Sequence, residues 1–127
     1  MLRYVVSALA LLSLAPLPAL AGSACDHPHN DFDGLYCLNK VYQDSDAQLN
    51  QWFGRVRAKL DASGQAALRS SQLDWMRDRN DRCSRKEGSQ FFVNLGCATQ
   101  MTVQRTEVLE DHYRACLASS CSWDNTK

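Results

Sequence analysis

The sequence carries no excess of charge of either sign. Its 127 residues include 14 lysines and arginines and 14 aspartates and glutamates. Loss of Arg3 with the leader described below would leave 13 basic residues against 14 acidic ones. A chain with this balance has no overall electrostatic field that attracts nucleic acid or an anionic membrane. We therefore expect no nucleic-acid partner, and a partner of another kind must be recognised by a local surface.

Linkers, repeats and long apolar runs are also scarce. The chain has only 3 prolines and 6 glycines, and they form no flexible linker. After residue 22 no apolar stretch approaches the roughly 20 residues that a membrane-spanning helix needs. The alternation of apolar and polar residues that marks a half-buried strand is missing. These absences predict one continuous helical domain with no membrane insertion after processing.

The N-terminal residues have the pattern of a cleavable secretory signal. Arg3 precedes an apolar run over residues 5–20, and Ala19-Leu20-Ala21 offers small residues for cleavage before Gly22. Removing 21 residues leaves 106, which suits a single domain. We expect a periplasmic or secreted protein, with a signal peptide at 1–21, a helical domain at 22–121 and a flexible tail at 122–127.

Six cysteines lie in the part that remains: Cys25, Cys37, Cys83, Cys97, Cys116 and Cys121. An even number of cysteines in an exported chain indicates disulfides, and the lack of a C-x-x-C pair argues against a zinc or redox motif. Closeness in sequence favours the pairs Cys25–Cys37, Cys83–Cys97 and Cys116–Cys121. The last pair cannot form within one unbroken helix, because five residues of helix rise about 7.5 Å. Ser119 and Ser120 must therefore lie outside regular helix.

Apolar residues at a spacing of three to four predict three helices. The first covers about residues 35–60, the second about 65–86, and the third begins near Cys97. Gly88 ends the second helix, and a loop over 87–96 follows. We expect an all-α fold, a small disulfide-stapled antiparallel helical bundle of about three main helices.

Two capping signals accompany the first helix. Asp31 or Asp33 is placed to cap its start. Ser45 and Gln48 have the spacing of a capping box, which predicts a break or kink near Asp44.

Five polar residues share helix faces with core residues: Asp46, Asn50, Gln72, Arg79 and Arg105. One interpretation makes them a catalytic or ligand-binding site. No nucleophile or general base stands at an obvious spacing beside them, so we favour a structural hydrogen-bonded network between helices. In that network Asp46 is a candidate carboxylate partner for an arginine.

The same residues carry a resemblance to a known family. The segment Leu68-x-x-x-Gln72-x-x-Trp75-x-x-x-Arg79-x-x-x-Cys83 resembles the central signature of the LprI-like family of lysozyme inhibitors. The family's first helix is similar to Cys37 with Asp46-x-x-Leu49-Asn50-x-x-Phe53, and its last to Cys97-x-x-x-Met101-Thr102-x-x-Arg105-x-x-x-Leu109. Cys116 and Cys121 are additions to the family's four cysteines. The resemblance implies an exported helical domain, with lysozyme binding proposed for some members.

Catalytic and metal-binding patterns are weak. Residues 25–34 contain two histidines and three aspartates, but an EF-hand alignment that starts at His29 would place Lys40 where calcium needs a glutamate. A polar cap before the first helix explains this segment better. His112 is expected at the edge of the core, and no serine has the setting of a nucleophile elbow. We therefore predict no enzyme activity, no metal and no cofactor.

The loop between the second and third helices is the best candidate for binding a protein. Adjacent aromatic residues stand among polar ones there, and Cys83 and Cys97 would close its base. A loop that is already closed loses less entropy on binding. The alternative is that one or both phenylalanines fold back as a lid over the bundle. The predicted partner-binding loop consists of Glu87, Ser89, Gln90, Phe91, Phe92 and Asn94.

The expected function is that of an exported envelope protein that inhibits lysozyme or a related peptidoglycan-cleaving enzyme by steric occlusion. The partner would be a protein, either a lysozyme-like enzyme or another envelope protein. One alternative is an immunity or adaptor protein that binds another periplasmic partner, such as a delivered toxin; another is a purely structural or stress-related domain. The balanced charge counts against a cationic lysozyme, because an acidic inhibitor would associate faster.

Overall fold

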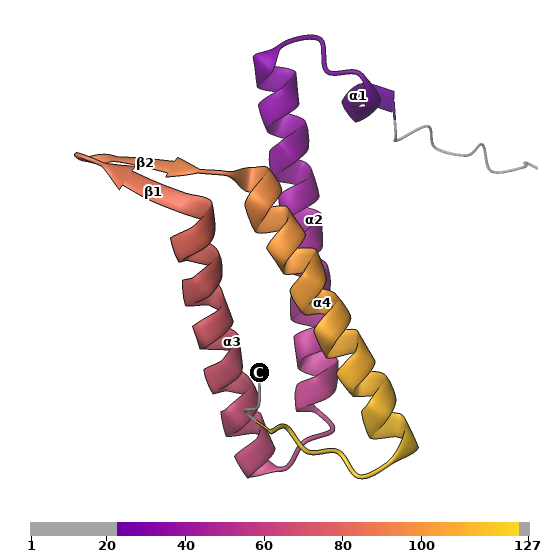
Figure 1. The fold of residues 1–127 in the computed structure, drawn as a ribbon. Coiled ribbons are helices and arrows are strands. Elements are labelled where there is room, and N and C mark those ends of the chain that lie inside the picture. Colours follow the sequence, from indigo (N-terminus) through magenta and orange to yellow (C-terminus); the bar gives the residue numbers. More distant parts are fainter. Residues whose placement is uncertain (1–22, 125–127) are drawn as a thin grey trace, which may run out of the picture.

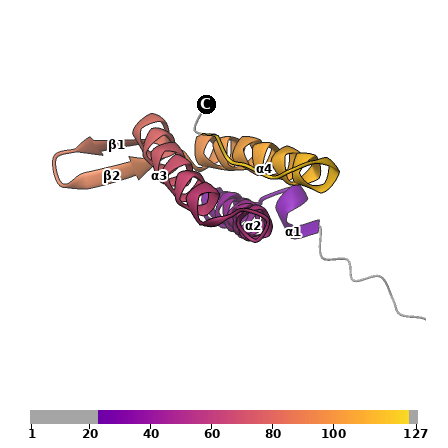
Figure 2. The same ribbon diagram turned by 90° about the horizontal axis from the view of Figure 1, so that it is seen from below.

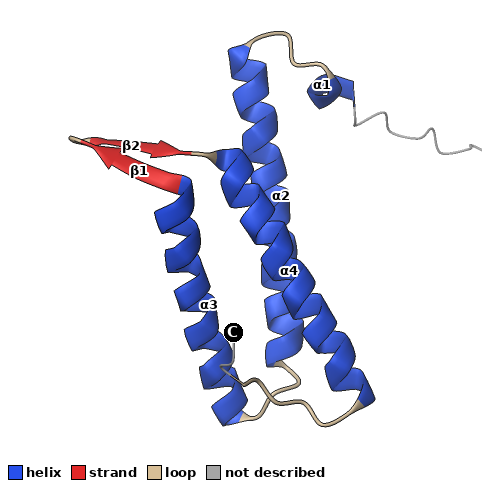
Figure 3. Ribbon diagram, in the orientation of Figure 1, coloured by secondary structure: helices blue, strands red, loops and turns tan. Residues whose placement is uncertain are grey.

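The computed structural model describes residues 23–124. The predicted signal peptide and the last three residues of the predicted tail, 125–127, lie outside the described residues. The described part is predominantly helical, with a short N-terminal helical turn, three long helices and one two-stranded hairpin (Figures 1 and 3). None of the described helices is both long and apolar enough to span a membrane.

Helix α1 (Ser23–Asp26) leads through a turn into α2 (Asp31–Arg57). The residue that caps α2 is Asn30, whose side chain accepts a hydrogen bond from the backbone N–H of Asp33 at 3.0 Å. The prediction of Asp31 or Asp33 as the cap was therefore wrong, because the capping residue stands one position before Asp31 and three before Asp33. Asp33 contributes in another way, because its carboxylate accepts a hydrogen bond from the backbone N–H of His29 at 3.2 Å.

Helix α2 continues without interruption through the position where a break was predicted. Ser45 lies inside the helix, and its hydroxyl donates a hydrogen bond to the carbonyl oxygen of Val41 at 2.8 Å. The prediction near Asp44 was wrong because this bond satisfies the hydroxyl within the helix, so the serine does not cap a new one.

Helix α3 (Ala62–Cys83) begins after Asp61, whose carboxylate accepts a hydrogen bond from the backbone N–H of Gly64 at 2.7 Å. It ends at Cys83 and not at the predicted Lys86, because Ser84 has extended backbone angles. The chain then forms strand β1 (Ser84–Glu87) and strand β2 (Gln90–Val93). Helix α4 (Leu95–Ala118) follows. The three predicted helices are confirmed, and the predicted loop between the last two contains a small sheet.

The long helices run alternately in opposite directions and form an antiparallel bundle (Figure 1). Helix α4 packs mainly against α2 and less extensively against α3. Seen from below, the hairpin extends beyond α3, away from the other two helices (Figure 2). The buried core between the helices is formed by Leu49, Val56, Leu60, Leu68, Leu109 and Trp123.

Three disulfides join the pairs that closeness in sequence predicted: Cys25–Cys37, Cys83–Cys97 and Cys116–Cys121. The helical geometry required for the last pair is met, because α4 ends at Ala118 and Ser119 has extended backbone angles. Each bond restricts the unfolded chain and stabilises the fold by about 2–3 kcal/mol in the loop-entropy account.

The segment after α4 is anchored in the core. Figure 1 shows it crossing from the end of α4 toward the start of α3, and Trp123 within it is only 9% exposed. The indole meets the His112 ring edge-on, with 4.4 Å between centroids, and the Arg105 guanidinium lies 5.4 Å from its centre. The prediction of a flexible tail was therefore wrong at Trp123, because burial of a large aromatic side chain outweighs the entropy of ordering two or three residues.

Replacing this anchor should reduce stability. We expect Trp123→Ala to lower the free energy of unfolding by about 3 kcal/mol, because it removes a buried aromatic side chain and leaves a cavity. The matched control is Asp124→Ala at the neighbouring exposed position, which should change it by less than about 0.5 kcal/mol. Urea unfolding followed by circular dichroism measures both, and equal midpoints for the two variants would contradict the anchoring.

Candidate functional site

The segment predicted as a loop is a β-hairpin. Its strands pair antiparallel, with Glu87 opposite Gln90 next to the turn. Gly88 and Ser89 form a two-residue turn, and Gly88 has a φ of 60°, which glycine adopts without steric strain. Turns with positive φ match the twist of two-stranded hairpins, so this Gly-Ser pair explains why the chain forms strands here despite their lack of alternation.

Both ends of the hairpin are fixed. The disulfide between Cys83 and Cys97 joins the last residue of α3 to the first turn of α4. Between them, the backbone N–H of Asn94 donates to the carbonyl oxygen of Cys83 at 2.8 Å. The Asn94 side chain accepts a hydrogen bond from the backbone N–H of Cys97 at 3.0 Å and caps α4. Asn94 therefore has a structural role here, and its contact with a partner stays a prediction.

The apolar side chains of the hairpin face solvent. Phe91 is 73% exposed, Val93 59% and Phe92 38%, and the hairpin points away from the bundle (Figure 1). Neither phenylalanine belongs to the buried core of the described residues. The alternative in which they form a lid over the bundle is thus wrong, and the two rings remain available to a partner.

The strand register divides the hairpin side chains between two faces, because residues directly opposite each other share a face. The Lys86 face consists of Ser84, Lys86, Phe91 and Val93. The Arg85 face consists of Arg85, Glu87, Gln90 and Phe92. Each face stacks a cation on an aromatic ring, with 5.4 Å from the Lys86 ammonium to the Phe91 centroid and 4.7 Å from the Arg85 guanidinium to the Phe92 centroid.

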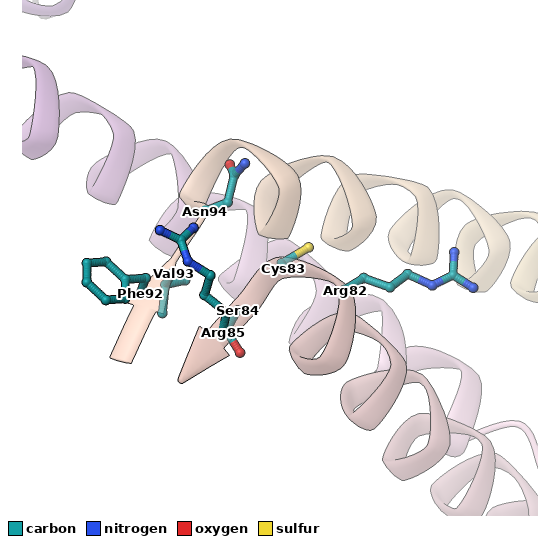
Figure 4. A pocket seen from close by; sticks show the side chains of 7 residues that line it. All are labelled: Arg82, Cys83, Ser84, Arg85, Phe92, Val93 and Asn94. Atoms are coloured by element: carbon teal, nitrogen blue, oxygen red, sulfur yellow. The ribbon is translucent and has the colours of Figure 1, made fainter. Parts of the chain in front are cut away.

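A shallow pocket lies where the hairpin leaves the bundle (Figure 4). Its volume is about 370 Å³. Figure 4 shows the Arg85 guanidinium beside the Phe92 ring, whereas Arg82 points the other way, away from the hairpin. Arg82 bonds to the carboxylate of Asp78 at 2.8 Å. The pocket lies at the base of the hairpin and takes side chains from both of its faces. It holds no cluster of groups arranged for catalysis among its lining residues, Arg82, Cys83, Ser84, Arg85, Phe92, Val93 and Asn94.

The structure places the predicted polar network in two groups. In the first, Arg79 is buried between the rings of Trp75 and Tyr42, 4.9 Å and 5.7 Å from their centroids. Its guanidinium lies 3.7 Å from the carboxylate of Asp46, which also accepts a hydrogen bond from the Asn50 side chain at 3.2 Å. This group connects α2 to α3.

The second group surrounds Arg105 on α4. Its guanidinium donates to the side-chain oxygens of Gln72 at 3.1 Å and Ser71 at 2.9 Å, both on α3, and Trp123 covers it. Burial lowers the pKa of Arg105 from its usual value, because the charged form loses hydration. Among the described residues no carboxylate pairs with this guanidinium, so its hydrogen bonds are what offset the cost of burial.

The histidines form no metal centre in the described residues. His27 and His29 are exposed beside the start of α2. His112 lies close to the sulfur atoms of Cys116 and Cys121, but these are bonded to each other and offer no thiolate to a metal ion.

Sequence reasoning missed three residues of the exposed hairpin: Arg85, Lys86 and Val93. They were assigned to the end of a helix or left outside the predicted binding residues. The sequence feature that predicts them is Gly88-Ser89 between two four-residue segments. A Gly-Ser pair in this position is typical of a two-residue hairpin turn, and a turn at this place pairs Lys86 with Phe91.

The chain matches a known family over most of this structure. Residues 25–109 match the family described as lysozyme inhibitor LprI, which is more than half of the chain and includes the whole hairpin. No curated protein and no solved structure matches the chain significantly.

The role of the second polar group can be measured. We expect Gln72→Leu to lower the free energy of unfolding by about 1.5–3 kcal/mol, because it removes an acceptor from a buried cation. The double variant Gln72→Leu/Arg105→Met should recover part of this loss, since the buried charge is removed as well. Gln104→Leu, at an exposed position on α4, is the control. Additive losses in the double variant would show that the two side chains do not act together.

Proposed function

Because the chain belongs to the LprI family of lysozyme inhibitors, we propose that it inhibits lysozyme or a related peptidoglycan-cleaving enzyme by steric occlusion. In this proposal the hairpin over residues 84–93 enters or covers the substrate cleft of the enzyme. The inhibitor forms no covalent bond and needs no cofactor. The mature protein acts in the periplasm or outside the cell, after removal of residues 1–21.

The observation that carries the proposal is the pair of exposed phenylalanines on a hairpin whose base is covalently closed. Burying a phenylalanine side chain contributes about 1.5–3 kcal/mol. A flexible loop would lose conformational entropy when it becomes ordered on binding, and this loss would cancel part of the gain. This hairpin is already ordered in the free protein by its disulfide, its turn and the Asn94 cap. Aromatic residues on a rigid support are typical anchors of tight protein interfaces.

The disulfides support the proposed location. All six cysteines are paired, and such bonds persist in oxidising compartments such as the periplasm. The balanced charge of the chain bears on the rate of binding, because it provides no long-range attraction to a cationic enzyme. Within this proposal the affinity comes from contacts made at short range, such as those of the exposed hairpin.

A second candidate function is that of an immunity or adaptor protein for another periplasmic partner, such as a delivered toxin. The observation that favours it is an exposed apolar surface on the first part of α2. Phe32 is 84% exposed, and four further apolar side chains nearby are exposed: Leu35, Tyr36, Leu38 and Val41. Apolar surfaces of this kind often contact other proteins.

Lysis of a bacterial cell-wall suspension by lysozyme tests the leading proposal. The oxidised protein from Gly22 onward should slow lysis in a dose-dependent manner. We expect Phe91→Ala/Phe92→Ala to raise the inhibition constant by about a hundredfold or more, because two aromatic anchors are lost.

Phe32→Ala is the matched control, since it removes an exposed phenylalanine from α2 and leaves the hairpin intact. Its inhibition constant should equal that of the unmodified protein. A weaker inhibitor with Phe32→Ala, together with an unchanged one with the hairpin variant, would move the binding site to α2. No inhibition by a folded, oxidised protein would reject the lysozyme proposal.

A further inference from the structure

The charges on the hairpin are not equally satisfied. Arg85 bonds to the carboxylate of Glu87 at 2.6 Å on the same face, and Arg82, at the end of α3, bonds to Asp78. Lys86 differs: among residues 23–124 no carboxylate lies within 4 Å of its ammonium group. Its ammonium group instead lies over the ring of Phe91, the residue directly opposite on β2. The Lys86 face therefore presents a cation that no carboxylate neutralises.

This cation is surrounded by apolar surface that a partner can bury. Phe91 and Val93 lie on the same face as Lys86 and are both mostly exposed. If the face is buried in a complex, the ammonium group loses water, and burial of an unpaired charge is strongly unfavourable. The partner must then supply hydrogen-bond acceptors, and a carboxylate is the strongest of these because a charge pair gains strength at a buried contact.

The target of the proposed function provides such groups. Enzymes that cleave glycosidic bonds place two carboxyl groups on either side of the scissile bond, in a cleft shaped for a sugar chain. An aromatic ring beside an ammonium group matches that cleft in both respects, since the ring can occupy a sugar-binding surface and the ammonium can reach a carboxylate. The Arg85 face lacks this match because its cation is already paired with Glu87.

From this complementarity, and resting on the proposed function, we infer that the Lys86 face of the hairpin enters the enzyme cleft and that Lys86 pairs with one of the two catalytic carboxylates. Phe91 and Val93 then fill the cleft beside it. The Arg85 face points out of the cleft, toward the rim. The partner class is thus a retaining or inverting glycosidase with an acidic cleft, and the inhibitor competes directly with the substrate.

The test measures inhibition and binding for two substitutions of one residue. Lys86→Met keeps most of the length of the side chain and removes the charge, and it should raise the inhibition constant by at least about tenfold. Lys86→Glu places two like charges together and should raise it by about a hundredfold or more. Lys59→Met, at the opposite end of the bundle, also removes an exposed lysine and should leave the constant unchanged. Circular dichroism and a thermal melt show that each variant is folded.

A double-mutant cycle identifies the group that Lys86 meets. Binding is measured by calorimetry with native lysozyme and with two lysozyme variants, each carrying an amide in place of one catalytic carboxylate. The loss caused by Lys86→Met should disappear with one of these two variants, because its partner charge is then absent.

The outcomes separate this inference from the proposed function. If the unmodified protein binds lysozyme and Lys86→Met binds equally well, the inference is overturned and the proposed function remains. The same holds if Lys86→Met weakens binding equally for native lysozyme and for both amide variants. If the unmodified protein neither binds nor inhibits, both the inference and the proposed function are overturned.

Discussion

The disulfide between Cys83 and Cys97 is the constraint on which the exposed part of the structure depends. It holds the end of α3 against the first turn of α4, at the point where the chain reverses direction between these two antiparallel helices (Figure 1). The hairpin between them has strands of only four residues each, all of them exposed. A two-stranded sheet of this size is marginal on its own in water. It persists here because its ends are joined covalently and by the hydrogen bond from Asn94 to Cys83.

The bundle itself depends on few apolar contacts. Among the described residues its central buried cluster consists of six apolar side chains, and half-buried aromatic side chains such as Trp52, Trp75 and Tyr113 pack around them. Two arginines are buried as well, each with its own partners: Arg79 beside Asp46, and Arg105 on Gln72 and Ser71. Hydrogen bonds of this kind are directional, so they select one alignment of the helices where apolar contacts alone would tolerate several. Gln72, Arg79 and Arg105, which carry the resemblance to the family, therefore connect the helices of this structure.

The helices and disulfides were predictable because they depend on short-range features of the chain. Apolar spacing identified the three helices, and closeness in sequence identified the three cysteine pairs. Errors arose where two local signals competed. The capping-box spacing at Ser45 suggested a break, yet its hydroxyl bonds within the helix. The hairpin was missed because its strands face solvent on both sides and so lack the alternation that marks a half-buried strand.

The sequence by itself determined the three long helices, the disulfide pairs and the two buried arginines, Arg79 and Arg105, since each follows from spacing along a few turns of chain. It left open whether the segment between the last two helices projects or folds back over the bundle. Only the tertiary structure decided three other features. It buried Trp123 against Arg105 and His112, because residues distant in sequence meet there. It placed Arg79 and Arg105 in two separate groups, with Arg79 beside Asp46 and Arg105 beside Gln72 and Ser71. It also placed Lys86 beside Phe91 and Arg85 beside Glu87, because strand register assigns side chains to faces and so decides which cation remains unpaired.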